Sequence, residues 1–297
     1  MELKQLFFFK TIAEFEHITK AAQKLDVAQS YLSKVMSDLE EELGLELFDH
    51  VGRQIKLNQK GRVFYKYVSH IFSTLDDAKR ELEDISASSE NQVSVATSSS
   101  LYMAKLLGNF KTLVPYAKIY QYSAKRHEMI KMLLEGEIDY ALCTPPISGP
   151  EFESIVVIEE VCAVIYPEGH WLSRYEEIDL SKLANEEFLS AIKGYGIRDI
   201  AETFFEKAGI APPITVASTD TSLIQNYVKN NVGIAFCPMT TIIHDDFLMK
   251  HHIIIKNPPC IGKVALTWKK DRYNCRVSKL FKAFAREYFE KLSLYQI

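Results

Sequence analysis

The stretch ITKAAQKLDVAQSYLSKVMS, residues 18–37, has the pattern of two short helices joined by a tight corner. Ala21 and Ala22 are small enough to let two helices approach each other closely, and Leu25 and Leu32 can fill the angle between them. In a helix-turn-helix, the first residues of the second helix enter the major groove of DNA and meet the base edges. The side chains predicted to do so share this helix start: Gln29, Ser30, Tyr31, Ser33 and Lys34.

These residue types suit the reading of bases. A glutamine can bond adenine through two hydrogen bonds, a serine can bond either type of base, and a lysine can reach guanine or a phosphate. The local pattern leaves an alternative open, in which residues 18–37 belong to a three-helix domain whose small residues serve packing alone.

The residues on both sides complete a winged domain. Apolar residues recur at helical spacing from Leu3 to Ala13, and Gly44 is placed to end the second helix of the pair. The expected elements are a first helix from residue 3, a helix over 20–25 with Thr19 as its N-cap, a helix over 28–43, and strands over 45–49 and 54–57. The strands form a hairpin, or wing, in which Arg53 and Lys56 are further candidate DNA contacts, as is Thr19.

A long helix is expected after the wing, over 59–86. Asn58 is a suitable N-cap. Apolar residues then recur with spacings of 4, 3, 4, 3, 4 and 3: Phe64, Val68, Ile71, Leu75, Ala78, Leu82 and Ile85. Such a seam can pack on its own domain or on a second copy of the chain. The polar run at 86–91 favours an exposed linker helix that pairs two chains.

From residue 92 the pattern changes to alternating strands and helices, which is typical of parallel βαβ units. Strands are expected at 92–97, 118–123, 138–144, 155–158, 161–166, 188–192, 214–217, 233–237 and 264–270, and helices at 101–113, 126–135, 197–208, 221–230 and 277–292. Continuously apolar strands such as 234–237 indicate a sheet that is covered on both faces.

Over residues 3–61 the chain resembles the winged helix-turn-helix of the LysR-type transcriptional regulators. The matching residues keep the family's order and spacing: Leu3, Leu6, Phe9, Ala13, Ile18, Thr19, Ala21, Ala22, Leu25, Gln29, Ser33, Leu39, Glu40, Leu43, Gly44, Leu47, Phe48, Arg53, Leu57 and Gly61. The sequence departs from the family at Glu16, His17, Ala28, Ser30, Tyr31, Asp49, His50 and Asn58. Glu16 and His17 stand where Gly and Ser are usual, and Tyr31 stands where Ala is common.

The chain length, the linker helix and the α/β region match as well, so the resemblance covers the whole chain. It implies an α/β fold with an N-terminal winged helix-turn-helix, a long linker helix and an effector domain of two subdomains like those of periplasmic binding proteins. It also implies a homodimer or homotetramer on double-stranded promoter DNA, a small effector between the subdomains, and RNA polymerase as a further candidate partner. The expected domains are 1–58, the linker and hinge 59–91, and the effector domain 92–297, with subdomain I at about 92–162 plus 264–297 and subdomain II at about 163–263.

Hydroxyl-bearing and small residues follow several predicted strands, at the edge where ligands of open α/β sheets bind. The candidate effector-binding residues are Ser98, Ser99, Ser100, Thr144, Lys193, Gly194 and Thr219. Hydroxyls, a helix start and one nearby cation favour a small carboxylate as the ligand, with an amino acid second. Tyr195 is the sole aromatic candidate, so no aromatic wall is predicted. If Asp220 faced the cleft, it would repel an anion or hold an amine, which would point to an amino acid; if it capped its helix, it would have no effect on the ligand. The resemblance adds that residues corresponding to Ser98, Ser100 and Thr144 often touch the effector.

Composition excludes several other classes of protein. Of 297 residues, 47% are apolar and 25% are charged, and no apolar run is long enough to span a membrane. The 35 Lys and Arg stand against 39 Asp and Glu, so any basic surface must be one face of a nearly neutral chain. The 5 cysteines form no CxxC pair and favour neither a disulfide framework nor a zinc cluster. The N-terminal segment lacks a signal-peptide pattern, so we expect a cytoplasmic protein.

Motifs of catalysis are absent from the sequence. It contains no G-x-S-x-G, H-E-x-x-H, P-loop or G-x-G-x-x-G pattern, so we expect no enzyme activity, no cofactor and no metal site. The alternative to a regulator is a solute-binding or enzymatic α/β protein with an accessory helical domain. Salt-dependent binding to DNA separates these two classes.

Overall fold

The computed structural model describes residues 1–51, 54–85, 91–98 and 102–294. The chain divides into two compact units, an N-terminal unit of residues 1–79 and a C-terminal unit of residues 80–297. Each unit has its own core of buried apolar side chains.

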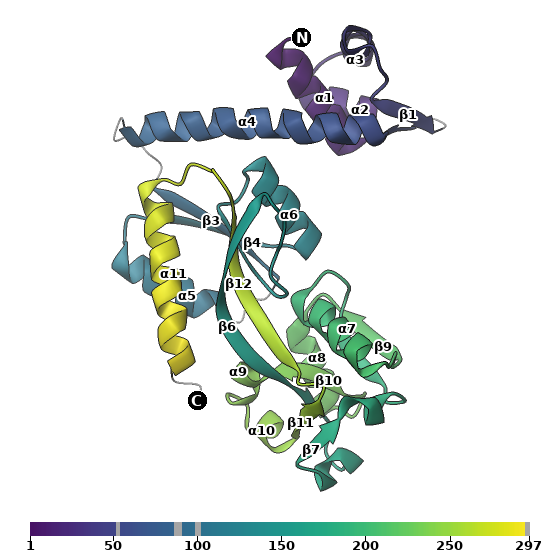
Figure 1. Cartoon of the computed structure of the whole chain (residues 1–297), viewed down its shortest axis with the longest axis vertical. Coiled ribbons are helices and arrows are strands. Elements are labelled where there is room, and N and C mark those ends of the chain that lie inside the picture. The colour runs from purple at the N-terminus through teal and green to yellow at the C-terminus, as the bar shows by residue number, and fades with distance from the viewer. Residues whose placement is uncertain (52–53, 86–90, 99–101, 295–297) are drawn as a thin grey trace. The chain divides into compact units, whose positions relative to one another are not determined.

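The N-terminal unit combines three short helices, a hairpin and the first part of a long helix (Figure 1). Its elements are α1 (Leu3–Phe15), α2 (Ile18–Leu25), α3 (Gln29–Leu43), β1 (Phe48–Val51), β2 (Gln54–Leu57) and α4 (Gln59–Ile85). Phe9, Ile12 and Leu32 are fully buried in its core, and the ring of Phe9 lies 5.0 Å from that of Phe64 on α4. These elements confirm the predicted winged helix-turn-helix.

Each corner of the helix-turn-helix contains one residue in the left-handed conformation. Glu16 has a φ of 44° and Asp26 a φ of 53°, which residues other than glycine adopt at a cost in free energy. The carboxylate of Glu16 accepts a hydrogen bond from the N–H of Leu57 at 3.1 Å, and this bond fastens the first corner to β2. The glutamate that replaces the usual glycine therefore makes a contact that glycine cannot make.

The start of α4 packs very closely on the segment before the wing. Asn58 is the predicted N-cap, and its Oδ1 accepts a hydrogen bond from the N–H of Gly61 at 2.8 Å. A Cβ atom on Gly61 would lie 2.0 Å from the carbonyl oxygen of Leu47. Only glycine fits this position without a shift of the backbone.

The apolar seam of α4 serves two purposes along its length. Phe64 and Val68 belong to the core of the N-terminal unit, so this part of the seam packs on its own domain. The exposed apolar side chains of the helix, with their exposed fractions, are Val63 (57%), Tyr67 (64%), Ile71 (39%), Leu75 (40%) and Leu82 (67%). The helix thus keeps an apolar face that the N-terminal unit does not cover.

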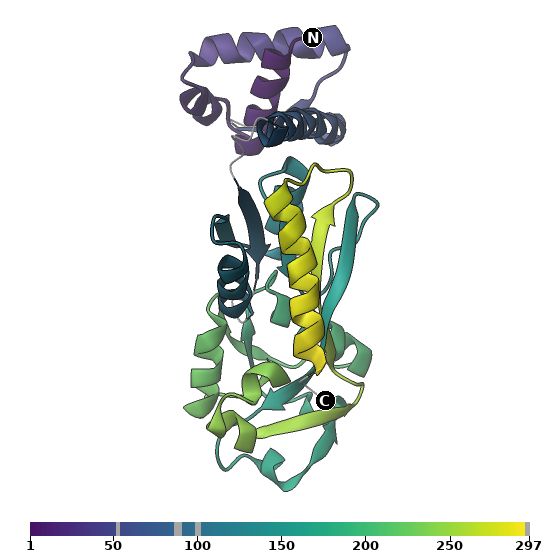
Figure 2. The same cartoon turned by 90° about the vertical axis from the view of Figure 1, so that its left-hand side faces the viewer.

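The C-terminal unit has two lobes. Lobe I consists of β3 (Gln92–Thr97), α5 (Met103–Leu113), β4 (Lys118–Ser123), α6 (Arg126–Glu135), β5 (Tyr140–Cys143) and α11 (Arg276–Leu294). As predicted, β3 pairs in parallel with β4 and β5. Helices α5 and α11 pack together on one face of the sheet, where α11 runs along the strands (Figure 2), while α6 packs against β5 and β12.

Two long strands connect the lobes. β6 (Phe152–Ile165) and β12 (Ile261–Lys269) pair antiparallel and run side by side (Figure 1). The sequence predicts two separate strands at 155–158 and 161–166, and this prediction was wrong. The ladder continues through the charged pair between them because Glu159 lies opposite Lys263 and forms an ion pair of 2.7 Å with it.

Lobe II contains β7 (Glu177–Asp179), β8 (Phe188–Ala191), α7 (Gly196–Ala208), β9 (Ile214–Ser218), α8 (Thr221–Lys229), β10 (Ala235–Pro238), α9 (Met239–Ile242), α10 (Asp246–Lys250) and β11 (His252–Asn257). β8 and β9 are parallel, but β10 pairs antiparallel with β6, which corrects the expectation of purely parallel units. The sequence did not predict β7, β11, α9 or α10, since elements of three to six residues carry little periodicity. None of the helices in the described ranges is both long and apolar enough to cross a membrane.

Candidate functional site

The first turn of α3 presents polar side chains to solvent. Gln29, Ser30 and Lys34 are exposed, and Ser33 is half-buried. The N-cap is Ala28, and no side chain caps the helix, so the N–H groups of its first turn remain open to a phosphate. Amide, hydroxyl and ammonium groups at an uncapped helix start are the groups that contact bases and phosphates in a major groove.

Thr19 lies beside this surface, on α2. The prediction that Thr19 is an N-cap was wrong, because Ile18 already has helical geometry and His17 is the N-cap. The hydroxyl of Thr19 instead donates a hydrogen bond to Oε1 of Gln29 at 3.3 Å. This contact orients the amide of Gln29 and leaves its N–H groups for another partner.

Tyr31 lies against α1. Its ring meets that of Phe8 edge to face with 6.1 Å between centroids, and Nζ of Lys4 is 5.5 Å from both centroids. The larger side chain is accommodated where alanine is common because it covers the contact between α1 and α3. With 44% of Tyr31 exposed, part of the ring still reaches solvent.

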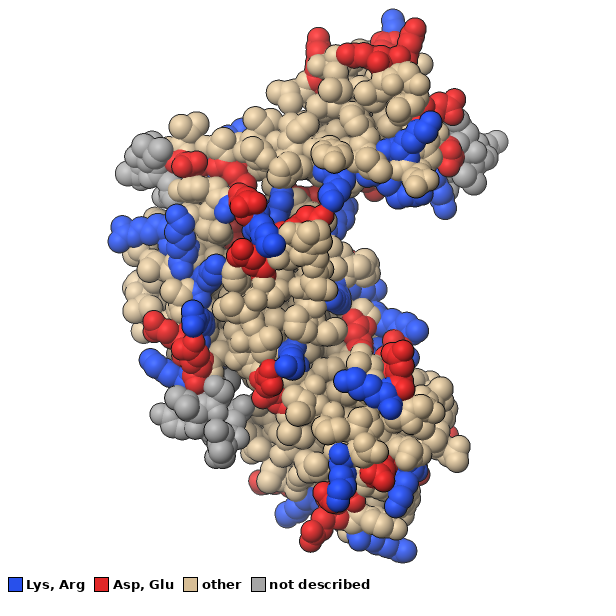
Figure 3. All heavy atoms as spheres, viewed as in Figure 1, with Lys and Arg blue, Asp and Glu red and all other residues tan. Residues whose placement is uncertain are grey.

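The wing supplies positive charge near α3. Lys56 is exposed on β2, opposite Asp49 in the register of the hairpin. Figure 3 shows a group of Lys and Arg side chains beside the hairpin, with some acidic side chains among them and a further acidic group at the top of the view. The predicted contact Arg53 lies outside the described residues.

Two cavities lie at the junction of the lobes, and Ser98 lines both of them. Thr144 lines the smaller one, of about 60 Å³, and its Oγ1 is buried with no hydrogen-bond partner in the described part of the chain. The structure therefore brings these two predicted residues together. Ser99 and Ser100 are not among the described residues.

Three other predicted residues line neither cavity. Lys193 is 78% exposed, and its Nζ lies 3.4 Å from a carboxylate oxygen of Glu202. Thr219 is exposed on the connection to α8. Gly194 accepts a hydrogen bond from the N–H of Arg126 at 3.0 Å, so it joins lobe II to lobe I instead of facing the cavities.

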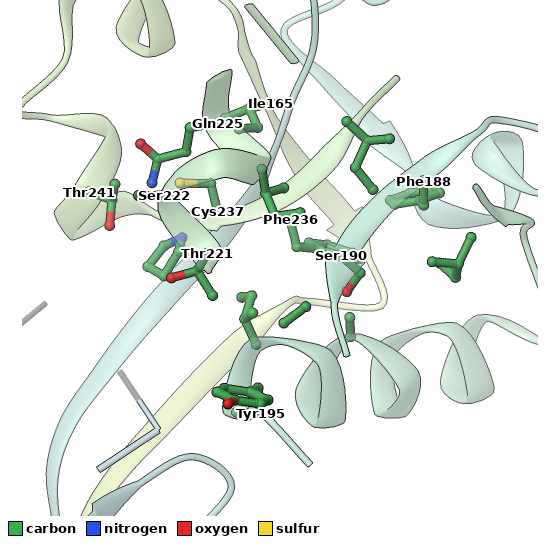
Figure 4. Close-up of a pocket in the computed structure, with 18 of the residues that line it drawn as sticks. Ile165, Phe188, Ser190, Tyr195, Thr221, Ser222, Gln225, Phe236, Cys237 and Thr241 are labelled. Carbon is green, nitrogen blue, oxygen red and sulfur yellow. The ribbon is translucent and has the colours of Figure 1, made fainter. Parts of the chain in front are cut away.

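The larger cavity, of about 190 Å³, extends into lobe II (Figure 4). Phe188, Phe205 and Phe236 line it, and the rings of Phe188 and Phe236 are stacked with 5.7 Å between centroids. The prediction of a pocket without an aromatic wall was therefore wrong. In the sequence these phenylalanines have the spacing of ordinary core residues, and only the packing shows that this core is incomplete on one side.

Polar groups line the remaining wall of the larger cavity. Figure 4 shows Thr221, Ser222 and Gln225 at one end of the cavity and Ser190 near Phe188 at the other. The side chains of Ser190, Thr221 and Gln225 have no hydrogen-bond partner among the described residues, and no charged side chain in that part of the chain lines the cavity. Over the same ranges, no cluster of three His, Cys, Asp or Glu residues could hold a metal ion.

The helices α7 and α8 both begin at this cavity, but they differ in capping. Asp220 caps α8, and its carboxylate accepts the N–H of Ser222 at 2.9 Å. No side chain caps α7, whose first residue, Gly196, lines both cavities. A Cβ atom on Gly196 would lie 2.6 Å from the carbonyl oxygen of Thr144, so the missing side chain lets α7 approach lobe I. An anion would find its open helix start at α7.

A partly buried carboxyl group links the two lobes through hydroxyls. The carboxyl oxygens of Glu160 on β6 lie 2.8 Å from the hydroxyl oxygen of Tyr102 and 2.5 Å from that of Thr240, and the two hydroxyl oxygens are 2.8 Å apart. Three contacts around this closed ring need three protons, and the two hydroxyls supply two, so a protonated carboxyl completes the ring. Burial raises the pKa of Glu160 above its ordinary value, against the opposing effect of the two hydrogen bonds.

The chain matches two family models in succession. The model for the "Bacterial regulatory helix-turn-helix protein, lysR family" matches residues 3–62, and the "LysR substrate binding domain" matches residues 86–290. Among curated proteins of Bacillus subtilis, the uncharacterized HTH-type transcriptional regulator YybE is 28% identical, covering 98% of this chain and 100% of its own length. The transcriptional dual regulator GltC is also 28% identical, with complete coverage of both chains. A solved full-length OxyR variant from Pseudomonas aeruginosa has the same fold, with a TM-score of 0.68, 19% identity, and coverage of 96% of this chain and 95% of that one.

Proposed function

The chain belongs to the LysR family of transcriptional regulators, which bind DNA and are not enzymes, and from this premise we propose a promoter-binding homodimer or homotetramer controlled by a small molecule. The effector binds at the junction of the lobes. Such a regulator works in the cytoplasm, where the chromosome is, and RNA polymerase is the further partner through which it would act.

The observation that carries the DNA-binding proposal is the uncapped, exposed start of α3. Gln29 is exposed, its Oε1 accepts the hydroxyl of Thr19, and Lys34 adds a positive charge about one turn later. The exposed Lys56 on the wing is suited to a phosphate of the same duplex.

Self-association is supported by the uncovered side of α4. Its exposed apolar side chains continue into an open hollow of about 430 Å³, which is lined by Leu43, Leu45, Leu47, Gln59, Lys60, Val63, Phe64 and Tyr67. Two such helices from two chains would cover each other's apolar faces and set the distance between the paired copies of α3.

A carboxylate is the favoured head group of the effector. The open start of α7, the hydroxyl of Ser98 and the unpartnered hydroxyl of Thr144 are donors for it, and the one carboxylate in the first turn of α7, Asp199, already accepts the N–H of Gly194 at 2.9 Å. An amino acid is disfavoured because Asp220, the acid that could have held its ammonium group, caps α8. Lys193 does not contribute, since it pairs with Glu202 at the surface.

Control of DNA binding requires that the effector binds one arrangement of the lobes more tightly than another. An effector that contacts both α7 in lobe II and Thr144 in lobe I satisfies this requirement, because it can make both contacts only while the two lobes are close together. A hundredfold difference in affinity between the two arrangements would shift their equilibrium by about 2.7 kcal/mol.

The test is a titration of the full-length protein against the duplex upstream of its own gene and against a shuffled duplex of equal length, followed by fluorescence anisotropy. We expect the upstream duplex to bind at least roughly a thousandfold more tightly, with an affinity that falls steeply between about 50 and 200 mM salt. Equal affinity for both duplexes at every salt concentration would contradict specific promoter binding.

A further inference from the structure

We propose that the effector is a ring compound that carries one carboxylate and at least one hydroxyl. The carboxylate lies at the start of α7, and the ring enters lobe II among Phe188, Phe205 and Phe236. This inference rests on the proposed function, because it names the class of molecule that binds at the same junction.

The size of the cavity fits a ring better than a short acyclic acid. A protein cavity of about 150 Å³ lined by leucine, isoleucine and phenylalanine binds benzene. The cavity of lobe II is about 190 Å³, which leaves room for a six-membered ring and a few additional atoms. A two- to four-carbon acid would leave most of the phenylalanine wall without contacts.

The polar groups on the wall specify what the ring carries. Ser190 is 9% exposed, and its hydroxyl has no partner in the described part of the chain, as is true of the Gln225 amide. Gln225 is half-buried, and both residues line the cavity, so their polar groups take hydrogen bonds from water or from a ligand substituent. They come from β8 and α8 and lie at opposite ends of the cavity, so each suits a hydroxyl at its own edge of the ring.

The charge of the ligand is limited to one carboxylate. Gly196 and Ile197 begin α7, line both cavities and place uncapped helix N–H groups between them. A second carboxylate would have to lie deeper in the larger cavity, where the described lining has no cation. An ammonium group would need an ionised Glu160, but Tyr102 and Thr240 already occupy both oxygens of that carboxyl.

The experiment measures binding of defined probes to the full-length protein by calorimetry and by thermal shift. The ring probes are benzoate, 3-hydroxybenzoate and 4-hydroxybenzoate, and the acyclic probes are acetate, succinate and glutamate. We expect the tightest ring probe to bind roughly 10- to 100-fold more tightly than any acyclic probe, because it buries apolar area that they lack. We also expect a hydroxybenzoate to bind more tightly than benzoate.

Two substitutions on the same helix locate the site. Ala201→Leu places a larger side chain in the cavity and should abolish binding of the ring probes, while Ala208→Leu makes the same change on α7 away from the cavity lining and should retain it. Gln225→Leu should remove the preference for a hydroxybenzoate over benzoate. A cooperative thermal transition for each variant shows that it is folded.

Two outcomes overturn the inference. One is an acyclic probe that binds as tightly as the best ring probe, or the absence of any ring binding at millimolar concentration. The other is ring binding that Ala201→Leu leaves unchanged. The DNA titration is independent of these measurements, so loss of the ring inference leaves the proposed function to be judged by its own test.

Discussion

At the start of α3 the polar side chains lie in water, whereas those of Ser190 on β8 and Gln225 on α8 face a cavity lined mainly by apolar residues. Gln29 and Lys34 can exchange hydrogen bonds with water for hydrogen bonds with DNA, so each contact contributes a modest net free energy. Ser190 and Gln225 have no such exchange among the described residues, and they stay unpaired until water or a ligand reaches them. The DNA-binding surface is therefore suited to discrimination among many similar partners, and the cavity to recognition of a single one.

The largest effect expected is on stability, from the same substitution in each unit. Gly61→Ala should destabilise the N-terminal unit by about 3 kcal/mol or more, because its Cβ would meet the backbone oxygen of Leu47. Gly108→Ala, in the exposed middle of α5, meets nothing within 4 Å and should stabilise the C-terminal unit by about 0.5–1 kcal/mol. Urea unfolding monitored separately for the two units measures both; equal and small effects would refute the close packing at Gly61.

The next effect concerns α4. Leu75→Glu would place a carboxylate in the proposed helix pair, where burial without a partner is costly, and should weaken self-association by roughly a hundredfold. Lys79→Glu introduces the same residue one turn later at a side chain that is 73% exposed, and it should leave association nearly unchanged. Analytical ultracentrifugation checks both variants. An intact oligomer for Leu75→Glu would show that another surface joins the chains.

On the DNA-binding surface we expect a smaller effect, on the discrimination between DNA sequences. Gln29→Ala should lower discrimination between the upstream and shuffled duplexes by about 1–3 kcal/mol if a two-bond contact to adenine is lost. Lys56→Ala, on the wing, should weaken binding to both duplexes alike and reduce the salt dependence by about one phosphate contact. Anisotropy titrations at several salt concentrations distinguish the two, and an equal loss on both duplexes for Gln29→Ala would contradict base reading.

At the junction of the lobes, we expect the contribution of Glu160 to stability to depend on pH. Since the native pKa of Glu160 is raised, the folded chain binds this proton more tightly than the unfolded chain does. Its contribution to stability is fully present below the ordinary pKa of 4.5 and is lost as the pH rises through the raised native value. Glu160→Gln keeps a donor and an acceptor in the ring but has no proton that titrates. As the pH rises from 4.5 through the raised native pKa, the thermal stability of the variant should therefore increase relative to that of the native chain.

Glu159→Gln is the matched control for this pH series. Glu159 is the neighbouring residue on β6, is about half exposed, and pairs with Lys263 across the strand. We expect its unfolding curve to follow that of the native chain. If the native chain and Glu160→Gln have parallel curves from pH 4 to about pH 8, a proton on Glu160 does not close the ring.

The last prediction is that oxidation has no effect on DNA affinity. Burial raises the pKa of Cys143 to about 11 and the pKa values of Cys237 and Cys260 to about 12, and it raises the pKa of Cys162 as well. Thiols that remain protonated react slowly with peroxide. DNA affinity should therefore be the same before and after mild peroxide treatment, and a reversible change that reductant removes would be evidence of a reactive cysteine.

The two regions also differ in how far the sequence predicts them. The helix-turn-helix depends on contacts between neighbours in the chain, so apolar spacing, the Asn58 cap and Gly44 were enough to predict α1, α3 and α4 closely. The cavity depends on residues far apart in the chain, such as Phe188 and Phe236, whose individual spacing is that of any buried strand. Ser98 and Thr144, which line the smaller cavity, were predicted as candidates because they follow strands at a sheet edge.

The course of the chain through β6 and β12 makes lobe II a single insertion. The chain leaves lobe I along β6 and returns along β12, and Val161 pairs with Ile261, so the two ends of the inserted segment lie next to each other. All three phenylalanines of the cavity and Gln225 belong to this segment, while Gln29 and α3 do not. An exchange of one continuous piece of the gene could therefore give such a regulator a new ligand and leave its target promoter unchanged. Ligand specificity and DNA specificity can thus be inherited separately.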